Sequence, residues 1–314
     1  MKILITGATG FIGGSFAARA AAKGHEVVCM VRRTSDTSLL EQLGAKLVYG
    51  RVEEASEVES VVAGELPGVV VHCAAVVMEK NEALLMKTNA GGTRNVCRSC
   101  LSHGVGRLIH VSSIAVVCGN DMPLSDAMPY SAKNPYGRSK IEAERIALDF
   151  RERGLDIAIL RPCMVYGEGE PHAMDRILRY ASMGILPVLD IPEQDSKLHL
   201  VYVGNVVDAI EMALEGGEAL TGTFIIADKD PITIRRFVDI LYSGLGGRRP
   251  PVVPGWLARS VLGAGPVRRR FQRIYRDRVY DISRAREVLG YDPAVSTEDG
   301  LSRTVRCWKE KARS

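Results

Sequence analysis

Short runs of apolar residues recur through the first half of the chain and alternate with longer stretches of helical composition. The apolar runs lie at residues 2–6, 27–31, 46–49, 69–73, 107–112 and 156–161, and the clearest helical stretches lie at 11–23, 83–102 and 136–153. Strands that are buried on both faces of a parallel sheet read as continuous apolar runs rather than as alternating ones. The pattern therefore predicts an α/β fold built on a doubly wound parallel sheet.

This regularity ends after Pro162, because glycine and proline residues crowd the segment from there to Pro192. Both residue types interrupt helices and strands, so we place the start of a second, smaller domain at this point. Apolar runs at 201–207 and 222–227 are typical of strands that return to the sheet. We expect a first domain at 1–161, to which 199–227 returns, and a discontinuous C-terminal domain at 162–198 and 228–314 that binds the substrate.

Three glycines, Gly7, Gly10 and Gly13, stand between the first predicted strand and the first predicted helix. Glycine lets the chain turn tightly, approach a pyrophosphate closely and pack the helix against the strand. The start of the helix adds unpaired N–H donors and the positive end of its dipole. The spacing predicts a Rossmann-type dinucleotide site, in which we include the neighbouring Thr9, Phe11 and Ile12.

The end of the second predicted strand indicates which dinucleotide this is. An NAD-selective site usually has a carboxylate there, which accepts hydrogen bonds from the ribose hydroxyls. This chain has Arg32 and Arg33 instead. Two guanidinium groups suit a 2′-phosphate, so the sequence favours NADP(H) as the cofactor. The alternatives are NAD(H) bound with the help of Asp36, and two arginines that form a solvated strand end.

Tyr136 and Lys140 are four residues apart in a helix that Pro135 opens, so their side chains share one face. The pKa of a phenol is ordinarily about 10, and a tyrosine that exchanges a proton at neutral pH needs that pKa lowered by about 3 units. A neighbouring ammonium group has this effect. An earlier strand ends in Ser112 and Ser113, at the carboxyl edge where ligands bind in open α/β folds.

With these motifs the chain resembles the extended short-chain dehydrogenases/reductases of the NAD-dependent epimerase/dehydratase group. The resemblance runs nearly from end to end. Besides the glycine turn, Ser113, Tyr136 and Lys140, it is carried by the segments 72–75, 89–93, 160–162, 165–167, 283–285 and 289–291. It implies that Tyr136 is the general acid/base, and that Lys140 lowers the pKa of Tyr136 and holds the nicotinamide ribose.

The resemblance assigns three more residues. It implies that Ser113 hydrogen-bonds the substrate oxygen, that Asn89 is a structural or proton-relay residue, and that Ala74 lies at the cofactor. Ser112 is the alternative to Ser113, which we prefer because it lies further out at the strand end. The resemblance also predicts a homodimer through the helices at 83–102 and 136–153.

Several departures from the group narrow the chemistry. Dehydratases of the group carry an acidic pair directly after the catalytic hydroxyl residue, whereas Ile114 and Ala115 follow Ser113 here. Sugar-nucleotide epimerases have an arginine near the position of Leu198 and an acid at the position of Asn205. This stretch is more similar to the 3β-hydroxysteroid dehydrogenase and dihydroflavonol reductase branches, which act on bulky, largely apolar alcohols and ketones. Arg51 stands where the group usually has an aspartate that contacts adenine. Either Arg51 stacks on adenine instead, or the site binds the cofactor less tightly.

The composition is that of an ordinary globular protein. The chain has 314 residues, of which 46% are hydrophobic and 25% are charged, and its formal net charge is +4. This small excess gives no support for nucleic acid or a membrane surface as a partner. The sequence predicts no signal peptide and no spanning segment, and its seven cysteines have no disulfide-framework spacing. We therefore expect a cytoplasmic protein.

Three further features remain outside the predicted site. Cys97, Cys100 and His103 follow helical spacing but are too few for a zinc site, so no metal is expected. His72 and His110 are read as core histidines. A basic patch is formed by Arg268, Arg269, Arg270, Arg273, Arg276 and Arg278, with Phe271 and Tyr275 between them. It is either a solvated helix face or a site for an anionic group of the substrate.

Together these observations predict an NADP(H)-dependent oxidoreductase that transfers a hydride between the nicotinamide and a secondary alcohol or ketone of a small-molecule substrate. The first alternative is a sugar-nucleotide 4-epimerase that retains its cofactor. The second is a non-catalytic NADP-binding redox sensor.

Overall fold

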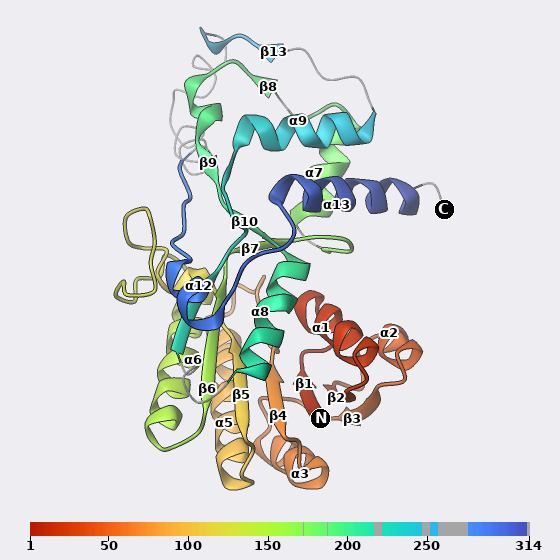
Figure 1. Ribbon diagram of the computed structural model, residues 1–314, viewed down its shortest axis with the longest axis vertical. Coiled ribbons are helices and arrows are strands. Elements are labelled where there is room, and N and C mark those ends of the chain that lie inside the picture. The colour runs from red at the N-terminus through yellow and green to blue at the C-terminus, as the bar shows by residue number, and fades with distance from the viewer. Residues whose placement is uncertain (172, 187, 217–221, 247–251, 257–275, 313–314) are drawn as a thin grey trace. The chain divides into compact units, whose positions relative to one another are not determined.

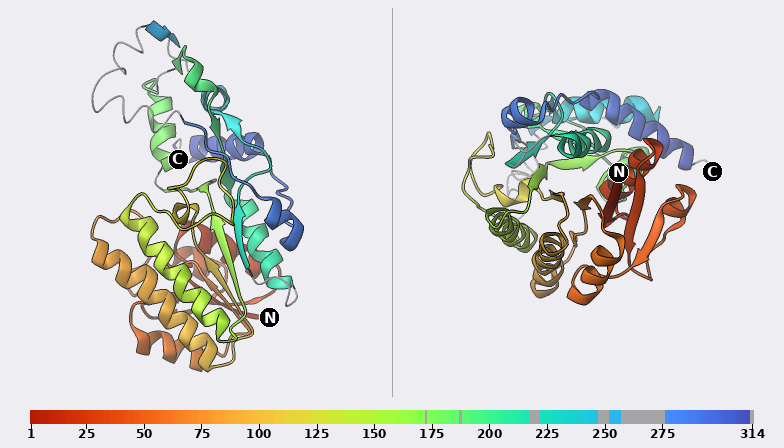
Figure 2. Two further views of the ribbon diagram at one scale, coloured as in Figure 1. Left: turned by 90° about the vertical axis from the view of Figure 1, so that its left-hand side faces the viewer. Right: turned by 60° about the horizontal axis from the view of Figure 1, so that its bottom comes forward.

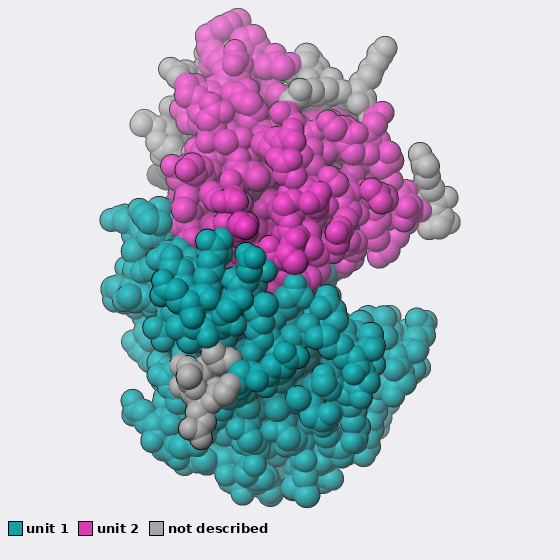
Figure 3. All heavy atoms as spheres, in the orientation of Figure 1, with its two compact units in different colours: residues 1–163, 206–226, 281–292 teal, residues 164–205, 227–280, 293–314 magenta. Residues whose placement is uncertain are grey.

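A computed structural model gives the structure of the chain and describes residues 1–171, 173–186, 188–216, 222–246, 252–256 and 276–312. The chain divides into two compact units, coloured separately in Figure 3. Unit 1 comprises residues 1–163, 206–226 and 281–292, and unit 2 comprises residues 164–205, 227–280 and 293–314.

Unit 1 is built on a seven-stranded parallel sheet (Figure 1). Its strands are β1 (Lys2–Thr6), β2 (Glu26–Val31), β3 (Lys46–Tyr49), β4 (Val69–His72), β5 (Arg107–Val111), β6 (Ile157–Pro162) and β11 (Gly222–Ile226). They lie in the order β3-β2-β1-β4-β5-β6-β11, so the direction of winding reverses between β1 and β4. The predicted Rossmann-type, doubly wound sheet is confirmed, and the reversal marks where a dinucleotide binds in such folds.

Helices cover both faces of this sheet (Figures 1 and 2). The helices α3 (Ala55–Glu65), α5 (Gly92–Ser102) and α6 (Pro135–Glu152) pack on one face, where Leu4, Val28, Val70 and Leu108 form the core with them. On the other face lie α1 (Phe11–Ala22) and the part of α8 (Val203–Glu215) that belongs to unit 1, joined by the ion pair of Arg19 with Asp208. Short helices α2 (Ser38–Gln42), α4 (Glu82–Leu85) and α12 (Ser283–Leu289) complete the unit, with a 3-10 turn at Ile114–Val116.

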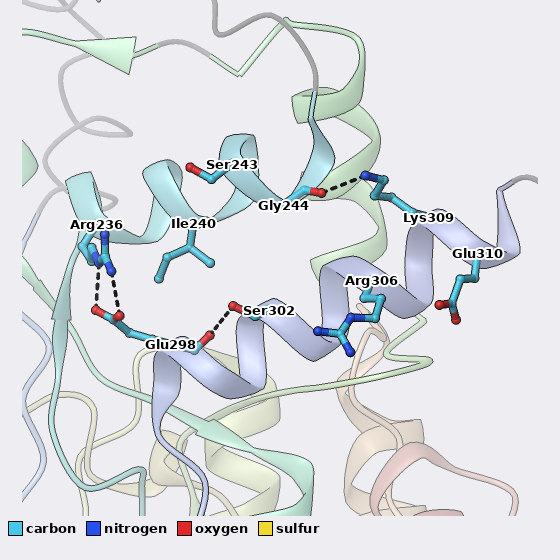
Figure 4. A pocket seen from close by; sticks show the side chains of 9 residues that line it. All are labelled: Arg236, Ile240, Ser243, Gly244, Glu298, Ser302, Arg306, Lys309 and Glu310. Carbon is cyan, nitrogen blue, oxygen red and sulfur yellow. Dashed lines mark hydrogen bonds and ion pairs between the residues drawn. The ribbon is translucent and has the colours of Figure 1, made fainter.

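Unit 2 contains short strands and several helices among its described residues, including the first residues of α8. The strands form three pairs, namely β7 (Met164–Tyr166) with β10 (Leu200–Tyr202), β9 (Lys197–Leu198) with β12 (Ile232–Thr233), and β8 (Val188–Leu189) with β13 (Val252–Val253). The helices are α7 (Ala173–Ser182), α9 (Ile234–Leu245) and α13 (Thr297–Lys311), and a 3-10 turn lies at Pro192–Asp195. The side chains of α9 and α13 line a pocket of about 620 Å³, in which Arg236 forms a two-pronged ion pair with Glu298 (Figure 4).

The structure corrects the strand expected at 201–207. Only β10 is extended, and it pairs with β7 rather than with the large sheet, while α8 begins at Val203. An apolar run of this length fits a buried strand and a buried helical turn equally well. Asn205 favours the helix here, because its amide donates to the carboxylate of Asp228 and to the carbonyl of Val295. The segment that belongs to unit 1 is therefore 206–226 rather than 199–227, and residues 281–292 join it.

The helix expected at 83–102 is also more complex than its sequence indicates. It consists of α4, a π-helical segment at Met86–Gly91, and α5. Segments of π-helix inside helices frequently occur at functional sites, because they rotate a side chain out of the helical register. The segment here contains Asn89.

Candidate active site

The glycine turn has the backbone geometry that its sequence predicts. Gly7 has φ +72°, and a Cβ on Gly7 would lie 2.6 Å from the backbone nitrogen of Ala74. A Cβ on Gly13 would collide with the carbonyl oxygen of Gly7. Gly10 is the N-cap of α1 and has no side chain, so no side chain of this residue caps the first N–H groups of the helix. The turn therefore brings β1, β4 and the open start of α1 within reach of one ligand, and this cradle fits a pyrophosphate.

A cavity of about 250 Å³ lies against this turn. Five of the predicted cofactor residues line it, namely Gly7, Thr9, Gly10, Arg32 and Ala74. Phe11, Ile12 and Gly13 form the first turn of α1 and are not among the lining residues. Sequence reasoning missed the remaining lining residues, which are Met30, Val31, Ser35, Gly50, Val52, Glu53, Cys73, Ala75, Val76 and Thr88. Most of them follow a strand end, so the order of the strands, once known, points to them.

The two arginines after β2 differ in their surroundings. Arg32 is exposed and lines the cavity. The guanidinium of Arg33 lies 5.0 Å from the ring centre of Tyr49, a cation–π contact, and Arg33 does not line the cavity. Asp36 accepts hydrogen bonds from the backbone N–H and the hydroxyl of Ser38, which hold its pKa below the ordinary value. Arg32 is thus the arginine that the structure places at the cavity.

Arg51 does not line the cavity. Its guanidinium lies 3.4 Å from the carboxylate of Glu57, and its backbone N–H donates to the same carboxylate. The neighbouring Val52 and Glu53 line the cavity instead. Stacking of Arg51 on adenine, which the sequence left as an alternative, therefore competes with an ion pair already made.

Tyr136 lies at the start of α6, and its hydroxyl shares a hydrogen bond with Ser113. Burial raises the pKa of Tyr136, and the hydrogen bond from Ser113 offsets part of that rise. The net shift is upward, which corrects the lowering expected from Lys140. The ammonium of Lys140 instead donates to the carbonyl of Val111 at 2.9 Å. Lys140 is 2% exposed, and burial lowers its pKa to about 8.

Ser112 and Ser113 point to different partners. Ser113 begins the 3-10 turn that follows β5, where its hydroxyl accepts from the N–H of Ala115 and contacts Tyr136. The buried hydroxyl of Ser112 donates to the carboxylate of Glu144. Because Ser112 has this buried partner, Ser113 is the serine that lies beside Tyr136.

Glu144 lies one turn after Lys140 and is the centre of a buried polar network. Its carboxylate is fully buried and accepts hydrogen bonds from Arg161 at 2.7 to 3.2 Å and from the hydroxyl of Tyr130 at 2.9 Å. Arg161 is 4% exposed. The network ties α6 to β5 and β6, and it therefore fixes the helix that carries Tyr136 and Lys140.

Asn89 joins the loop after β4 to the same helix. Its side-chain amide exchanges two hydrogen bonds with the backbone of Val76 and donates to the hydroxyl of Ser139, which donates to the carbonyl of Tyr136. Asn89 is 1% exposed. These contacts are those of a structural residue, which is one of the two roles that the resemblance implies.

The carbonyl of Asn89 also ends a chain of hydrogen bonds that crosses the sheet. Thr93 donates its hydroxyl to that carbonyl, so its oxygen accepts from Nε2 of His72 at 3.1 Å. His72 is neutral, because burial lowers its pKa to about 3, and its Nδ1 therefore accepts from Thr6 at 2.6 Å. Thr6 accepts in turn from the N–H of Ala74, at the glycine turn. His72 is thus a satisfied core histidine, as predicted.

The remaining sequence candidates lie apart from this arrangement. Cys97 and Cys100 are buried in α5, and His103 pairs with Glu59. Of the basic patch, the structure describes Arg276 and Arg278, whereas Arg268, Arg269, Arg270 and Arg273 lie outside the described residues, as do Phe271 and Tyr275. None of the helices in the described part of the chain combines the length and the apolar character needed to cross a bilayer.

A profile of the NAD dependent epimerase/dehydratase family matches residues 3–227. The chain belongs to this family. Its place there confirms the resemblance predicted from the glycine turn, Tyr136 and Lys140, and it identifies the chain as an NAD(P)-dependent enzyme.

Related sequences carry out several reactions. A 2-alkyl-3-oxoalkanoate reductase of Stenotrophomonas maltophilia is 27% identical, over 96% of this chain and 98% of its own. A UDP-glucose 4-epimerase of Vibrio cholerae is 29% identical, over 98% of this chain and 95% of its own. A 3-beta-hydroxysteroid dehydrogenase of Mycolicibacterium neoaurum is 25% identical, over 96% of this chain and 89% of its own. Reductases, dehydrogenases and epimerases are thus at similar distances from this chain.

Solved structures support the fold. A UDP-glucose 4-epimerase of Thermotoga maritima, solved with UDP-glucose, has a TM-score of 0.81 and 24% identity, and covers 99% of this chain and 100% of its own. A Thermus thermophilus UDP-glucose 4-epimerase, solved with NAD, has a TM-score of 0.78 and 23% identity, and covers 98% of this chain and 99% of its own.

Proposed function

We propose that this family member is an NADP(H)-dependent oxidoreductase that interconverts a secondary alcohol and a ketone. The observation that carries the proposal is the contact between Ser113 and Tyr136, at the carboxyl edge of the sheet that also holds the glycine turn. Bound NADP(H) supplies or accepts the hydride at its nicotinamide ring. The residues of the chain bind the substrate oxygen and move its proton.

Tyr136 exchanges a proton between its hydroxyl and the substrate oxygen. Ser113, already hydrogen-bonded to that hydroxyl, orients it and donates to the same oxygen as charge develops there. Burial raises the pKa of Tyr136, so its hydroxyl is protonated at neutral pH, which is the form that a general acid needs in ketone reduction. Lys140 holds the nicotinamide ribose, and Glu144 and Arg161 keep its helix in place.

At three places this chain lacks residues that dehydratases or epimerases of the family use, and this favours simple alcohol–ketone interconversion. Ile114 and Ala115 follow Ser113, so the acid and base needed to eliminate water are missing from that turn. Leu198 is buried in β9, at the position near which epimerases have an arginine for the diphosphate. Asn205 is buried against Asp228 and supports the start of α8. The related reductase and hydroxysteroid dehydrogenase sequences support the same assignment of reaction type.

We also propose NADP(H) over NAD(H), because Arg32 lines the cavity at the end of β2 and no carboxylate follows β2 directly. The family accommodates NAD, which is present in the Thermus thermophilus epimerase structure. The preference therefore rests on Arg32.

The test is net oxidation of NADPH, followed at 340 nm, with a panel of bulky apolar ketones. The wild-type protein should turn over at least one of them, and Tyr136→Phe should lose about a hundredfold or more in kcat, because general acid catalysis contributes about 10²–10⁴-fold. Tyr180→Phe, an exposed tyrosine on α7, is the matched control and should keep full activity. Turnover of a UDP-sugar without net NADPH oxidation would establish the 4-epimerase instead. Tight NADPH binding with no turnover of either substrate class would establish a sensor.

A further inference from the structure

His110 is a buried titratable residue with no role in the chemistry derived above. It lies on β5, two residues before Ser112, and is 1% exposed. Within the described ranges neither of its ring nitrogens has a hydrogen-bond partner. A buried imidazole must satisfy one N–H donor and one nitrogen lone pair, and leaving both unpaired is unfavourable. The ring therefore needs a polar partner in the space beside it.

The neighbouring strands and helix limit what that partner is. His110 pairs in register with His72 on β4 and with Ile159 on β6. The two imidazole rings stack with their centres 5.3 Å apart. His72 has both nitrogens committed to Thr6 and Thr93, so it has no atom left for His110. The partner of His110 must therefore come from an element other than β4.

Lys140 of α6 is a cation whose charge acts on the ring. Burial of the ring, and secondarily the positive charge of Lys140, hold the pKa of His110 well below the ordinary value, so His110 is neutral and keeps one acceptor nitrogen. The other titratable groups that interact with Lys140 are His72 at the end of β4, Cys73 directly after it, and Glu144 from α6. His72 and Cys73 are neutral, and the Glu144 carboxylate is occupied by Arg161, Tyr130 and Ser112. None of these groups satisfies His110.

Lys140 also has donors to spare. An ammonium group carries three N–H donors. In the described part of the chain Lys140 uses one of them, on the carbonyl of Val111. The peptide of Val111 directly follows His110 along β5, so the ammonium lies beside the residue whose ring lacks partners.

We propose that His110 is a positioning residue for Lys140, and that its neutral ring holds one buried water molecule which accepts a hydrogen bond from the Lys140 ammonium. The water links the two residues, because it accepts from Lys140 and donates to the unprotonated nitrogen of His110, so the lone pair of the ring gains a partner. The ammonium then donates to the carbonyl of Val111 and to the water, and its third N–H remains for the cofactor ribose. The bridge also favours the charged form of Lys140, which its burial disfavours.

The proposal is tested through cofactor binding, which needs no substrate. The dissociation constant of NADPH is measured from pH 6 to 9 for wild type, His110→Phe and His110→Gln. Removing the bridge should lower the pKa of Lys140 by about 1 unit, from about 8 in wild type. At pH 8 the charged fraction then falls from about one half to about one tenth, so the dissociation constant of His110→Phe rises about fivefold. At pH 6 both proteins stay charged, and the constants should agree within about twofold.

Two comparisons separate positioning from a general structural role. His110→Gln keeps a polar group and should restore most of the affinity at pH 8, and His103→Phe, far along α5, should match wild type throughout. An equal loss of affinity at every pH would overturn the proposal, as would a pH profile of His110→Phe that coincides with that of wild type.

If His110→Phe does not fold, NMR of the wild-type protein with labelled histidine decides the question. A cross-peak between the His110 ring and a bound water supports the bridge, and a ring without one overturns it. The inference rests on the family's cofactor binding and not on the substrate. A protein that shows the predicted affinities but reduces no ketone would refute the proposed oxidoreductase and leave the role of His110 standing.

Discussion

Arg32 should set the preference for NADP(H), and replacing it should remove that preference. Arg32→Ala takes away a guanidinium that lines the cavity at the end of β2, without disturbing the core, because the side chain is exposed. A hydrogen bond to a charged group contributes about 1.5–3 kcal/mol. Water screens an exposed pair, so we take the lower end, about 1.5 kcal/mol, which is roughly a tenfold change in affinity.

The neighbouring arginine supplies a matched control. Arg33 carries the same charge, one residue away, but its guanidinium lies over the ring of Tyr49 rather than at the cavity. Arg33→Ala should weaken NADPH binding by no more than about threefold, which is the long-range effect of one charge at moderate ionic strength. Both variants should bind NADH within about twofold of wild type, since NADH has no 2′-phosphate.

The assay is fluorescence titration with NADPH and NADH for wild type and both variants. The quantity of interest is the ratio of the two dissociation constants, because it cancels any general damage to the site. Arg32→Ala should lower the preference for NADPH about tenfold, and Arg33→Ala should leave it nearly unchanged. Tighter binding of NADH than NADPH by the wild-type protein would refute the reasoning, and so would an unchanged ratio in Arg32→Ala.

Three further predictions concern stability and assembly. Gly13→Ala should weaken cofactor binding and lower the free energy of unfolding, measured by urea denaturation, by about 1–3 kcal/mol, because the added Cβ meets the Gly7 carbonyl. Gly64→Ala, in open space on α3, is the control and should raise the free energy of unfolding by about 0.5 kcal/mol. Glu144→Ala should cost about 3–5 kcal/mol by the same measurement, since it leaves Arg161 charged and buried, and Glu144→Leu with Arg161→Met should recover much of the loss. We also propose that the chain forms a homodimer through α5 and α6, so its mass in solution should be twice the 34.2 kDa of one chain; a single-chain mass would contradict this.

The sequence by itself determined the class of fold and the family to which the chain belongs. The continuous apolar runs in the first half of the chain indicated buried strands of a parallel sheet, because each side chain in such a strand meets a helix. The roles of Gly7 and Gly13 were predictable because a tight turn between a strand and a helix leaves no room for a Cβ at these positions. Tyr136 and Lys140 were legible because helical spacing alone places them on one face.

Tertiary structure decided everything that depends on which atoms face one another. The guanidinium of Arg33 lies over the ring of Tyr49, so Arg32 is the arginine at the cavity. The hydroxyl of Ser112 donates to Glu144, so Ser113 is the serine beside Tyr136. The strand ends at Tyr202 and α8 begins at Val203, where the amide of Asn205 donates to Asp228 and to the carbonyl of Val295, both distant in the chain. Tertiary structure also raised the pKa of Tyr136, since burial depends on the surrounding elements rather than on the residue four positions along. The periodicity of a sequence predicts which face of a helix or strand a side chain lies on, but the packing of distant elements determines its hydrogen-bond partner and its burial.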